Sequence, residues 1–155
     1  MRPLLLVAAV GLLAGCSREP VHGGKNAAEW TKSLQDSDPK VRAQAARGLA
    51  AIGKRSEKAV PDLINALKDP DGKVRANAAE ALWSLGKRAK EAVPALIEAL
   101  KDPQLDVRLN AAGALGEIGA DALPAVPALT KAQRDPSADV RDTATEALKK
   151  IQGKK

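Results

Sequence analysis

The side chains that most often carry out chemistry are scarce in this sequence. Its 155 residues include one cysteine, Cys16, and one histidine, His22. Two such residues cannot supply the ligands of an ordinary zinc site, and a single cysteine cannot form a disulfide within the chain. General acid–base catalysis needs a histidine, or a carboxylate whose pKa is shifted in a cleft, whereas His22 lies in a short polar segment beside two glycines. We therefore predict a protein that is not an enzyme and that holds no metal or cofactor.

Cys16 directly follows a short apolar segment. Arg2 precedes an apolar run of about twelve residues that ends at Ala14. Such a run is too short to span the roughly 30 Å hydrocarbon core of a bilayer, and it is typical of a secretory signal peptide. The sequence Leu-Ala-Gly-Cys at 13–16 resembles the lipobox of bacterial lipoproteins, with an ordinary signal peptide beside a chance cysteine as the alternative.

The lipoprotein resemblance implies an anchored protein. In that family the chain is cleaved before the cysteine, so residues 1–15 are expected to be removed and Cys16 to be lipidated on its thiol and its new amine. Two or more acyl chains make membrane anchoring stable. Ser17 favours the periplasmic side of the outer membrane under the enteric sorting rule, with the cell surface or the inner membrane as alternatives. Residues 16–26 then form the lipidated cysteine and a flexible tether in the bacterial cell envelope.

A 33-residue unit recurs four times after this segment. Asp36 and Asp69 are 33 positions apart, and the spacing continues without insertion through the chain. Two polar columns keep this register, one of aspartates and one of arginines: Asp36, Asp69, Asp102 and Asp135, and Arg42, Arg75, Arg108 and Arg141. A fixed period of this length is the signature of a solenoid.

Each unit has the pattern of two helices. Val41, Ala45, Leu49 and Ile52 form one apolar stripe with helical spacing, and a glycine then ends the long helix. A shorter helix follows, with a proline in its first turn. Trp30 takes the place of a core leucine in the first unit and is expected to be buried at the open end of the stack. We predict pairs at about 27–59, 60–92, 93–125 and 126–152, and a basic tail at 153–155.

The repeated motif D-P-x-x-x-V-R-x-x-A-A-x-A-L-x-x-[IL]-G resembles HEAT-like repeats of the phycobilin-lyase type, which also occur in many bacterial scaffolds. The resemblance covers about 125 residues and implies an all-α fold, a right-handed α-solenoid of four stacked helix pairs. The motif is specific for the fold and nearly silent on function, and the function that we predict is a scaffold that binds another protein. A phycobilin-lyase-like or other cofactor-handling role is the alternative function.

The aspartate and arginine columns are interpreted as a structural ladder. Each aspartate can accept backbone N–H groups that the following helix leaves unpaired at its start. Each arginine can reach a turn aspartate of its own or the adjacent repeat through a charge-assisted hydrogen bond. Binding of a polyanion by four evenly spaced arginines is the alternative.

The concave face is the candidate partner-binding surface, because the resemblance places the long helices there. Arg47, Glu80, Trp83 and Leu109 are the side chains predicted to meet the partner on this face. Trp83 projects among small residues and is either an exposed interface anchor or a ring folded against a neighbouring helix, with Leu109 expected beside it.

A basic edge is the second candidate surface. The chain carries 25 Lys and Arg against 19 Asp and Glu, a formal net charge of +6, and it contains neither Phe nor Tyr. The scarcity of aromatic side chains to stack on bases argues against nucleic acid. Six cations in the first two inter-repeat segments could instead meet anionic lipid, which gives a membrane-surface module as a further alternative function: Lys54, Arg55, Lys58, Lys87, Arg88 and Lys90.

Overall fold

The computed structural model describes residues 23–153. The predicted signal peptide, Cys16, Ser17 and His22 lie outside the described residues, as do the last two lysines of the predicted basic tail. Within residues 23–153 the secondary structure is helical and no strand occurs. The predicted all-α solenoid is confirmed.

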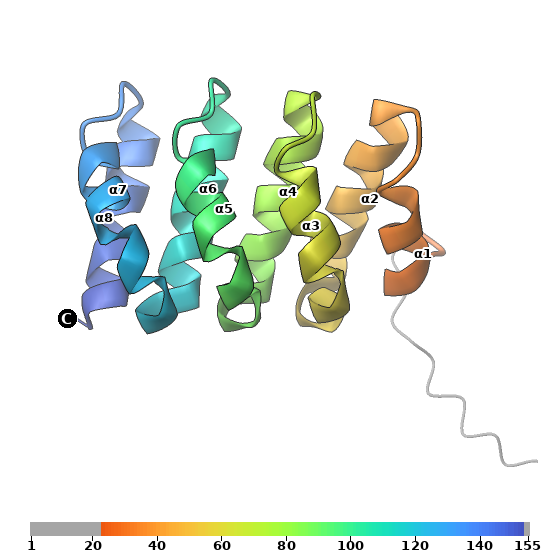
Figure 1. Cartoon of the computed structure of the whole chain (residues 1–155), viewed down its shortest axis with the longest axis horizontal. Coiled ribbons are helices and arrows are strands. Elements are labelled where there is room, and N and C mark those ends of the chain that lie inside the picture. The colour runs from red at the N-terminus through yellow and green to blue at the C-terminus, as the bar shows by residue number, and fades with distance from the viewer. Residues whose placement is uncertain (1–22, 154–155) are drawn as a thin grey trace, which may run out of the picture.

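Four helix pairs follow one another along the described chain, each made of a short helix and a long one (Figure 1). The pairs are α1 (Ala27–Ser33) with α2 (Pro39–Ile52), α3 (Val60–Ala66) with α4 (Gly72–Leu85), α5 (Val93–Ala99) with α6 (Leu105–Ile118), and α7 (Val126–Ala132) with α8 (Ala138–Gln152). Three 3-10 helices link the pairs: η1 (Gly53–Ala59), η2 (Gly86–Ala92) and η3 (Gly119–Ala125).

The three linking segments share one local structure. Each is a 3-10 helix that buries two small residues three positions apart, as in the pairs Ser56 and Ala59 or Ala89 and Ala92. A 3-10 helix has three residues per turn, so residues at this spacing share one face. Small side chains at these two positions let the linker lie against the core.

A glycine ends each of the first three long helices in a backbone conformation that other residues avoid. Gly53, Gly86 and Gly119 have φ of +61°, +56° and +74°, with ψ near −130°. A glycine lacks the Cβ that excludes this region for L-residues. The chain can therefore turn directly from a long helix into the 3-10 helix.

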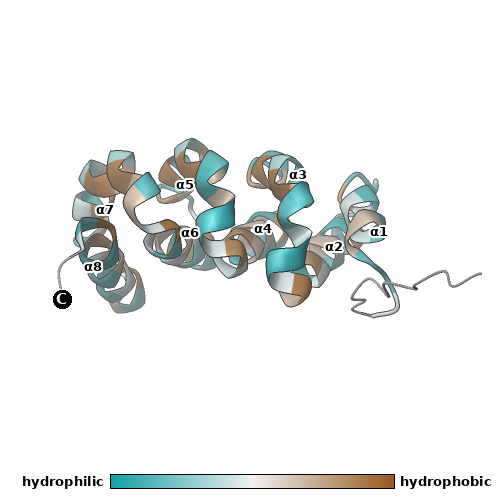
Figure 2. Ribbon diagram, turned by 90° about the horizontal axis from the view of Figure 1, so that it is seen from below, coloured by the Kyte–Doolittle hydropathy of each residue, from teal (hydrophilic) through white to brown (hydrophobic). Residues whose placement is uncertain are grey.

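The short and long helices form two layers. Each long helix packs against the next, α2 on α4, α4 on α6 and α6 on α8, while each short helix packs on the long helix of its own pair. Figure 2 shows the long helices along the inner side of a shallow curve. This stacking leaves a surface of α2, α4, α6 and α8 facing outward on the concave side.

The core is one continuous cluster between the two layers, running from Trp30 to Ile151. Trp30 is buried as predicted, and its ring lies on Gly48, where an added Cβ would come within 2.5 Å. The equivalent position in the later repeats is an alanine. A glycine at position 48 thus makes room for the larger ring in the first repeat.

The array has two ends that differ in structure. We call the end that carries the turns between short and long helices the turn end, and the end that carries η1, η2 and η3 the η end. Figure 1 shows the turn end at the top and the η end at the bottom. No helix in the described part of the chain is long and apolar enough to cross a membrane.

Candidate functional site

The first three arginines of the column are each paired with the aspartate of the following repeat. Arg42 donates from Nε to Asp69 Oδ2 at 2.7 Å and from Nη2 to Asp69 Oδ1 at 3.0 Å. The same two-bond pairing joins Arg75 to Asp102 and Arg108 to Asp135. In such a bidentate pair the planar guanidinium matches the carboxylate, which gives both strength and a defined geometry.

Each arginine also holds its own turn. Nη1 of Arg75 donates to the carbonyl oxygens of Asp69 at 2.8 Å and Pro70 at 3.1 Å. The side chains of Arg42, Arg75 and Arg108 are 15%, 14% and 16% exposed. Most of their donors are therefore used inside the protein, which favours the structural role over the binding of a polyanion.

The aspartates act one step away from the helix start. Asp69 Oδ1 accepts the N–H of Asp71 at 2.9 Å, and Asp71, the residue before α4, then caps the helix by accepting from Lys73 and Val74. The aspartate column thus accepts a backbone N–H at the helix start, as expected, and the N–H that it reaches is that of the N-cap residue and not one of the first turn.

The ion pairs shift the pKa of the buried ladder carboxyls. The hydrogen bond from Arg42 lowers the pKa of Asp69, and that from Arg108 lowers the pKa of Asp135. Burial acts to raise the pKa of Asp102, but the hydrogen bonds from Arg75 and from the N–H of Gln104 outweigh it and the pKa is lowered. All three carboxyls are therefore held ionised below their usual titration range.

A second ladder joins the long helices and was missed by the sequence analysis. Asn77 Nδ2 donates to the carbonyl oxygen of Ala43 at 2.8 Å, and Asn110 Nδ2 donates to that of Ala76 at 3.0 Å. Both residues lie in one column at the 33-residue spacing, which is the signal that would have identified them. These bonds fix the register of α4 against α2 and of α6 against α4.

Trp83 is partly exposed and also packs against a neighbouring helix, so it has features of both predicted placements. Its side chain is 36% exposed, and one side of the ring lies on Gly113 of α6, where an added Cβ would come within 2.7 Å. Leu109 is half-buried and packs on the core. The ring therefore covers the glycine and presents its remaining surface to solvent.

An open depression of about 610 Å³ borders Trp83. It brings Glu80 and Trp83 together, while Arg47 and Leu109 lie outside its lining. The polar residues around the ring come from two helices, α4 and α6, and two linkers, η1 and η2: Lys54, Glu80, Ser84, Lys87, Arg88, Asn110 and Glu117. Sequence reasoning treated the concave face and the basic edge as separate, but they meet at this depression.

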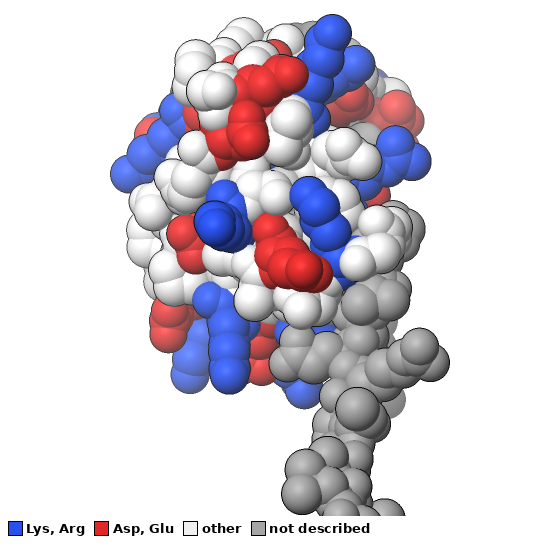
Figure 3. Space-filling model, turned by 90° about the vertical axis from the view of Figure 1, so that its right-hand side faces the viewer, with Lys and Arg blue, Asp and Glu red and all other residues white. Residues whose placement is uncertain are grey.

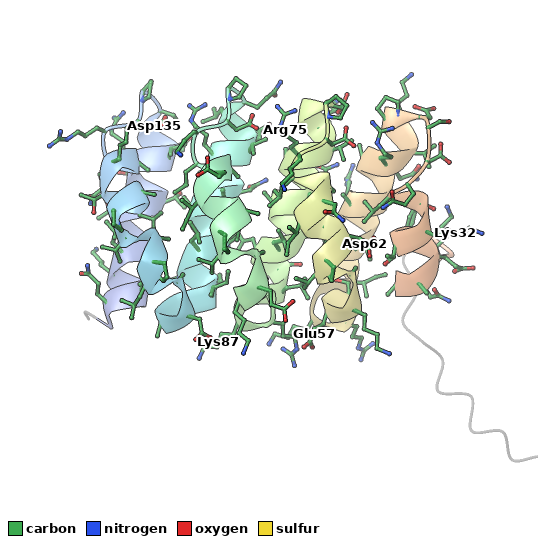
Figure 4. All side chains as sticks on the ribbon, viewed as in Figure 1. Lys32, Glu57, Asp62, Arg75, Lys87 and Asp135 are labelled. Carbon is green, nitrogen blue, oxygen red and sulfur yellow. The ribbon has the colours of Figure 1, made fainter. Side chains whose placement is uncertain are left out.

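The six cations of the predicted basic edge lie in η1 and η2, and all six are exposed. Figure 4 places Lys87 and Glu57 at the η end and Arg75 and Asp135 at the turn end. Arg88 forms an ion pair with Glu57 at 3.0 Å, between side chains that are 46% and 59% exposed. Exposed pairs of this kind add little to stability.

Residues 23–153 contain no group of three or more His, Cys, Asp or Glu side chains placed to hold a metal ion. The surface beside the depression consists of one tryptophan among small, polar and charged groups. Such a surface is suited to binding.

Three solved structures illustrate the similarity of this fold to known proteins. An engineered protein, Northeast Structural Genomics Consortium target OR497, matches with a TM-score of 0.67 and 27% identity, covering 84% of this chain and 38% of that chain. A designed armadillo repeat protein in complex with the peptide (KR)4 matches with a TM-score of 0.70 and 21% identity, over 79% of this chain and 62% of that chain. The complex of CpcE and CpcF of phycocyanin lyase from Nostoc sp. PCC7120 matches with a TM-score of 0.65 and 24% identity, over 77% and 78%.

These structural similarities support conclusions about the fold and not about function. The last two structures are less than 25% identical and show the fold alone, and the chain spans less than two thirds of the length of the two engineered proteins. No curated protein matches the sequence. The family model for HEAT repeats matches residues 27–90 and 61–149. Since these matches cover most of the chain, it belongs to the family of HEAT repeat proteins.

Proposed function

We propose that this HEAT repeat chain is a lipid-anchored scaffold of the bacterial cell envelope that binds another protein and catalyses no reaction. The observation that carries the proposal is Trp83, which stands 36% exposed on the concave side and rests on Gly113 beside an open depression. A large apolar ring that needs no further cover for the fold, surrounded by polar side chains, has the character of an interface anchor. Anchoring rests on the lipobox-like sequence that ends at Cys16.

Capture of the partner tests the binding role. A crosslinking pull-down from native membranes compares wild type with Trp83→Ala, and Leu105→Ala is the matched control because Leu105 is also a large exposed apolar residue, at 41%, but lies at the turn end. We expect one protein to be enriched by wild type and Leu105→Ala and lost with Trp83→Ala, while circular dichroism shows that both variants remain helical and folded. Equal recovery from all three would remove Trp83 from the binding site.

A second outcome of that experiment bears on the alternative function. The likeness to the CpcE and CpcF complex of phycocyanin lyase is the observation that keeps a cofactor-handling role under consideration. If no protein is captured and the purified chain carries a stoichiometric pigment or other small molecule, as its absorption and mass spectra would reveal, the scaffold proposal fails in favour of that role.

Anchoring is tested separately with Cys16→Ser. The thiol is the atom that would carry the diacylglycerol group, so the variant is expected to leave the membrane fraction and to lose the mass of the lipid. Ser17→Ala is the matched control and keeps the cysteine. Retention of Cys16→Ser in membranes would show that this residue is not the anchor.

A further inference from the structure

The η end is the basic end of the molecule. The linkers η1 and η2 carry six cations, namely Lys54, Arg55, Lys58, Lys87, Arg88 and Lys90, whereas the three linkers together carry three carboxylates, Glu57, Glu91 and Asp121. Among these cations only Arg88 is in an ion pair within the described chain. At the turn end the ladder arginines of the first three repeats are instead held by carboxylates. Lys and Arg side chains also gather at the lower rim of the first repeat in Figure 3, which is its η end.

These cations are not required by the fold. The third linker, η3, has none of them, and yet it is a seven-residue 3-10 helix in the same register, with Ala122 and Ala125 buried as in the other two linkers. Comparison of η3 with η1 and η2 thus shows that the linker adopts the same structure with and without the cations. Because the cations of η1 and η2 are not needed for folding, they are available for binding.

The third linker offers a different kind of side chain at the same end. Leu123 is 56% exposed and is followed by an exposed proline. Figure 2, which views this end, shows η1 and η2 as hydrophilic and η3 as markedly less so. Cations beside an exposed apolar side chain are the combination that binds at a membrane interface, where the charges meet anionic headgroups and the apolar group enters the acyl boundary.

The N-terminal end of the described chain also lies at the η end. Ala27, Ala28 and Thr31 at the start of α1 line one depression together with Lys54 and Lys58 of η1. Ten residues join Cys16 to Asn26, the residue before α1. Even fully extended, a segment of this length spans at most about 35 Å, so a lipid on Cys16 would keep the η end within that distance of the bilayer.

We propose that the η end docks on an anionic phospholipid bilayer, with the cations of η1 and η2 on the headgroups and Leu123 at the acyl boundary. This proposal rests on the lipid-anchored function above, which it extends by assigning an orientation. The helix axes then lie along the membrane normal and lead from the bilayer to the turn end. The concave face opens sideways, parallel to the membrane. Trp83 lies within reach of the surface, since its depression is lined by Lys54, Lys87 and Arg88.

Vesicle binding of the unlipidated mature chain tests the docking face by itself. Residues 16–155 with Cys16→Ser retain the whole described core, which runs from Trp30 to Ile151. Co-sedimentation uses vesicles of phosphatidylcholine with one quarter phosphatidylglycerol, and vesicles of phosphatidylcholine alone. We expect binding to the anionic vesicles only, and release when the salt is raised from 0.1 M to 0.5 M, because salt screens exposed charges.

Two fourfold variants of equal charge locate the face. One replaces Lys54, Lys58, Lys87 and Lys90 at the η end by Gln, and the matched control replaces the exposed Lys40, Lys68, Lys73 and Lys101 at the turn end. Each cation near an anionic leaflet contributes about fivefold to binding. The η-end variant is therefore expected to bind at least tenfold more weakly, and the control to change by less than about twofold, with circular dichroism showing that both are folded.

Three outcomes would overturn the proposal. The first is wild-type protein that ignores anionic vesicles, and the second is equal weakening in both variants, which would indicate net charge alone. The third is an η-end variant that keeps vesicle binding but loses a captured acidic protein. None of these depends on lipidation or on Trp83, so a failed Cys16→Ser or Trp83→Ala experiment would leave the vesicle result standing, and the reverse is also true.

Discussion

Asp102 occupies the middle of the ladder and accepts three hydrogen bonds. Arg75 donates two of them, at 2.7 Å and 3.1 Å, and the N–H of Gln104 donates the third at 2.9 Å. Arg75 and Asp102 are 14% and 10% exposed, so the pair is largely shielded from water. Removing the charge of one partner leaves the other desolvated without compensation, which makes a shielded pair costly to break.

Asp102→Asn is therefore expected to lower the free energy of unfolding by about 1–3 kcal/mol at pH 7. Asp36→Asn is the matched control, because Asp36 accepts the N–H of Asp38 and no arginine of residues 23–153 donates to its carboxylate. Its cost is expected to stay within about 0.5 kcal/mol. Urea unfolding of both variants measures the difference, and equal losses would contradict a role for the ion pair.

The same ladder predicts acid sensitivity. The pKa values of Asp69, Asp102 and Asp135 lie below the usual 3.8 in the folded protein. A lowered folded pKa contributes stability that is complete above the unfolded value and is lost as the pH falls through the folded value. Wild type is thus expected to lose stability below about pH 4. The difference in melting temperature between wild type and Asp102→Asn is expected to become smaller there, and thermal melts at pH 7, 4 and 2.5 would measure it.

At the scale of the elements, the ends of the long helices decide how the repeats are linked. Gly86 ends α4 at φ +56° and ψ −129°, and η2 begins at the same residue. At the other end of α4, Gly72 is the first helical residue, and an added Cβ there would meet the side chain of Gln104 at 2.6 Å. The two glycines therefore bound the same helix, but only the backbone of Gly86 has a positive φ.

Gly86→Ala is expected to destabilise the protein by roughly 1–3 kcal/mol, because an L-residue is strained in this conformation. Gly72→Ala, the control in the same helix, is expected to be neutral or slightly stabilising. The exposed Gln104 side chain can move aside, and alanine favours the helix over glycine by about 1 kcal/mol. Chemical unfolding would separate the two, and a Gly86→Ala variant as stable as wild type would contradict the strain argument.

At the scale of the whole molecule, each repeat is covered only by its neighbours. The last long helix, α8, packs closely on α6, and an added Cβ on Gly116 would come within 2.9 Å of the Cα of Ala147. On its outer side the last repeat is more polar, with Gln133 Nε2 donating to Thr145 Oγ1 at 3.0 Å. The fourth pair therefore acts as a cover for the third.

A chain that ends at Ala125 lacks this cover. The side chains of Leu115 and Ile118, which are 0% and 1% exposed, would lose part of their burial. We expect the free energy of unfolding to fall by about 3 kcal/mol or more. Hydrogen exchange is expected to accelerate most in α5 and α6 and least in α1 and α2, because each repeat of a solenoid is stabilised by its contacts with the adjacent repeats. Uniform acceleration across all remaining helices would indicate one cooperative unit instead.

Much of this architecture could be predicted from the sequence because it is encoded locally and repeated. The apolar spacing from Val41 to Ile52 predicts a long helix, the proline at 61 marks the start of a short one, and the strict period implies stacking. The burial of Trp30 follows in the same way, since it replaces a core leucine in its column. Four copies of one pattern confirm each other, which a single copy cannot do.

Other features depended on distances between repeats, which no local pattern contains. The sequence left open whether Arg42 reaches an aspartate of its own or the adjacent repeat, and the stacking of α2 on α4 brings it to Asp69. Sequence reasoning likewise could not place Trp83 on Gly113, because the two residues are 30 positions apart on different helices. The meeting of the basic linkers with the concave depression has the same origin.

The sequence by itself thus determined the four pairs of α-helices and their order, because hydrophobic spacing and helix-ending residues act within a few turns of the chain. Only the tertiary structure decided which side chains meet, how far Trp83 is exposed, and that the cations and the start of α1 share one end. These depend on how closely one repeat packs on the next, and that closeness is set by small residues such as Gly113 and Gly116 acting across helices.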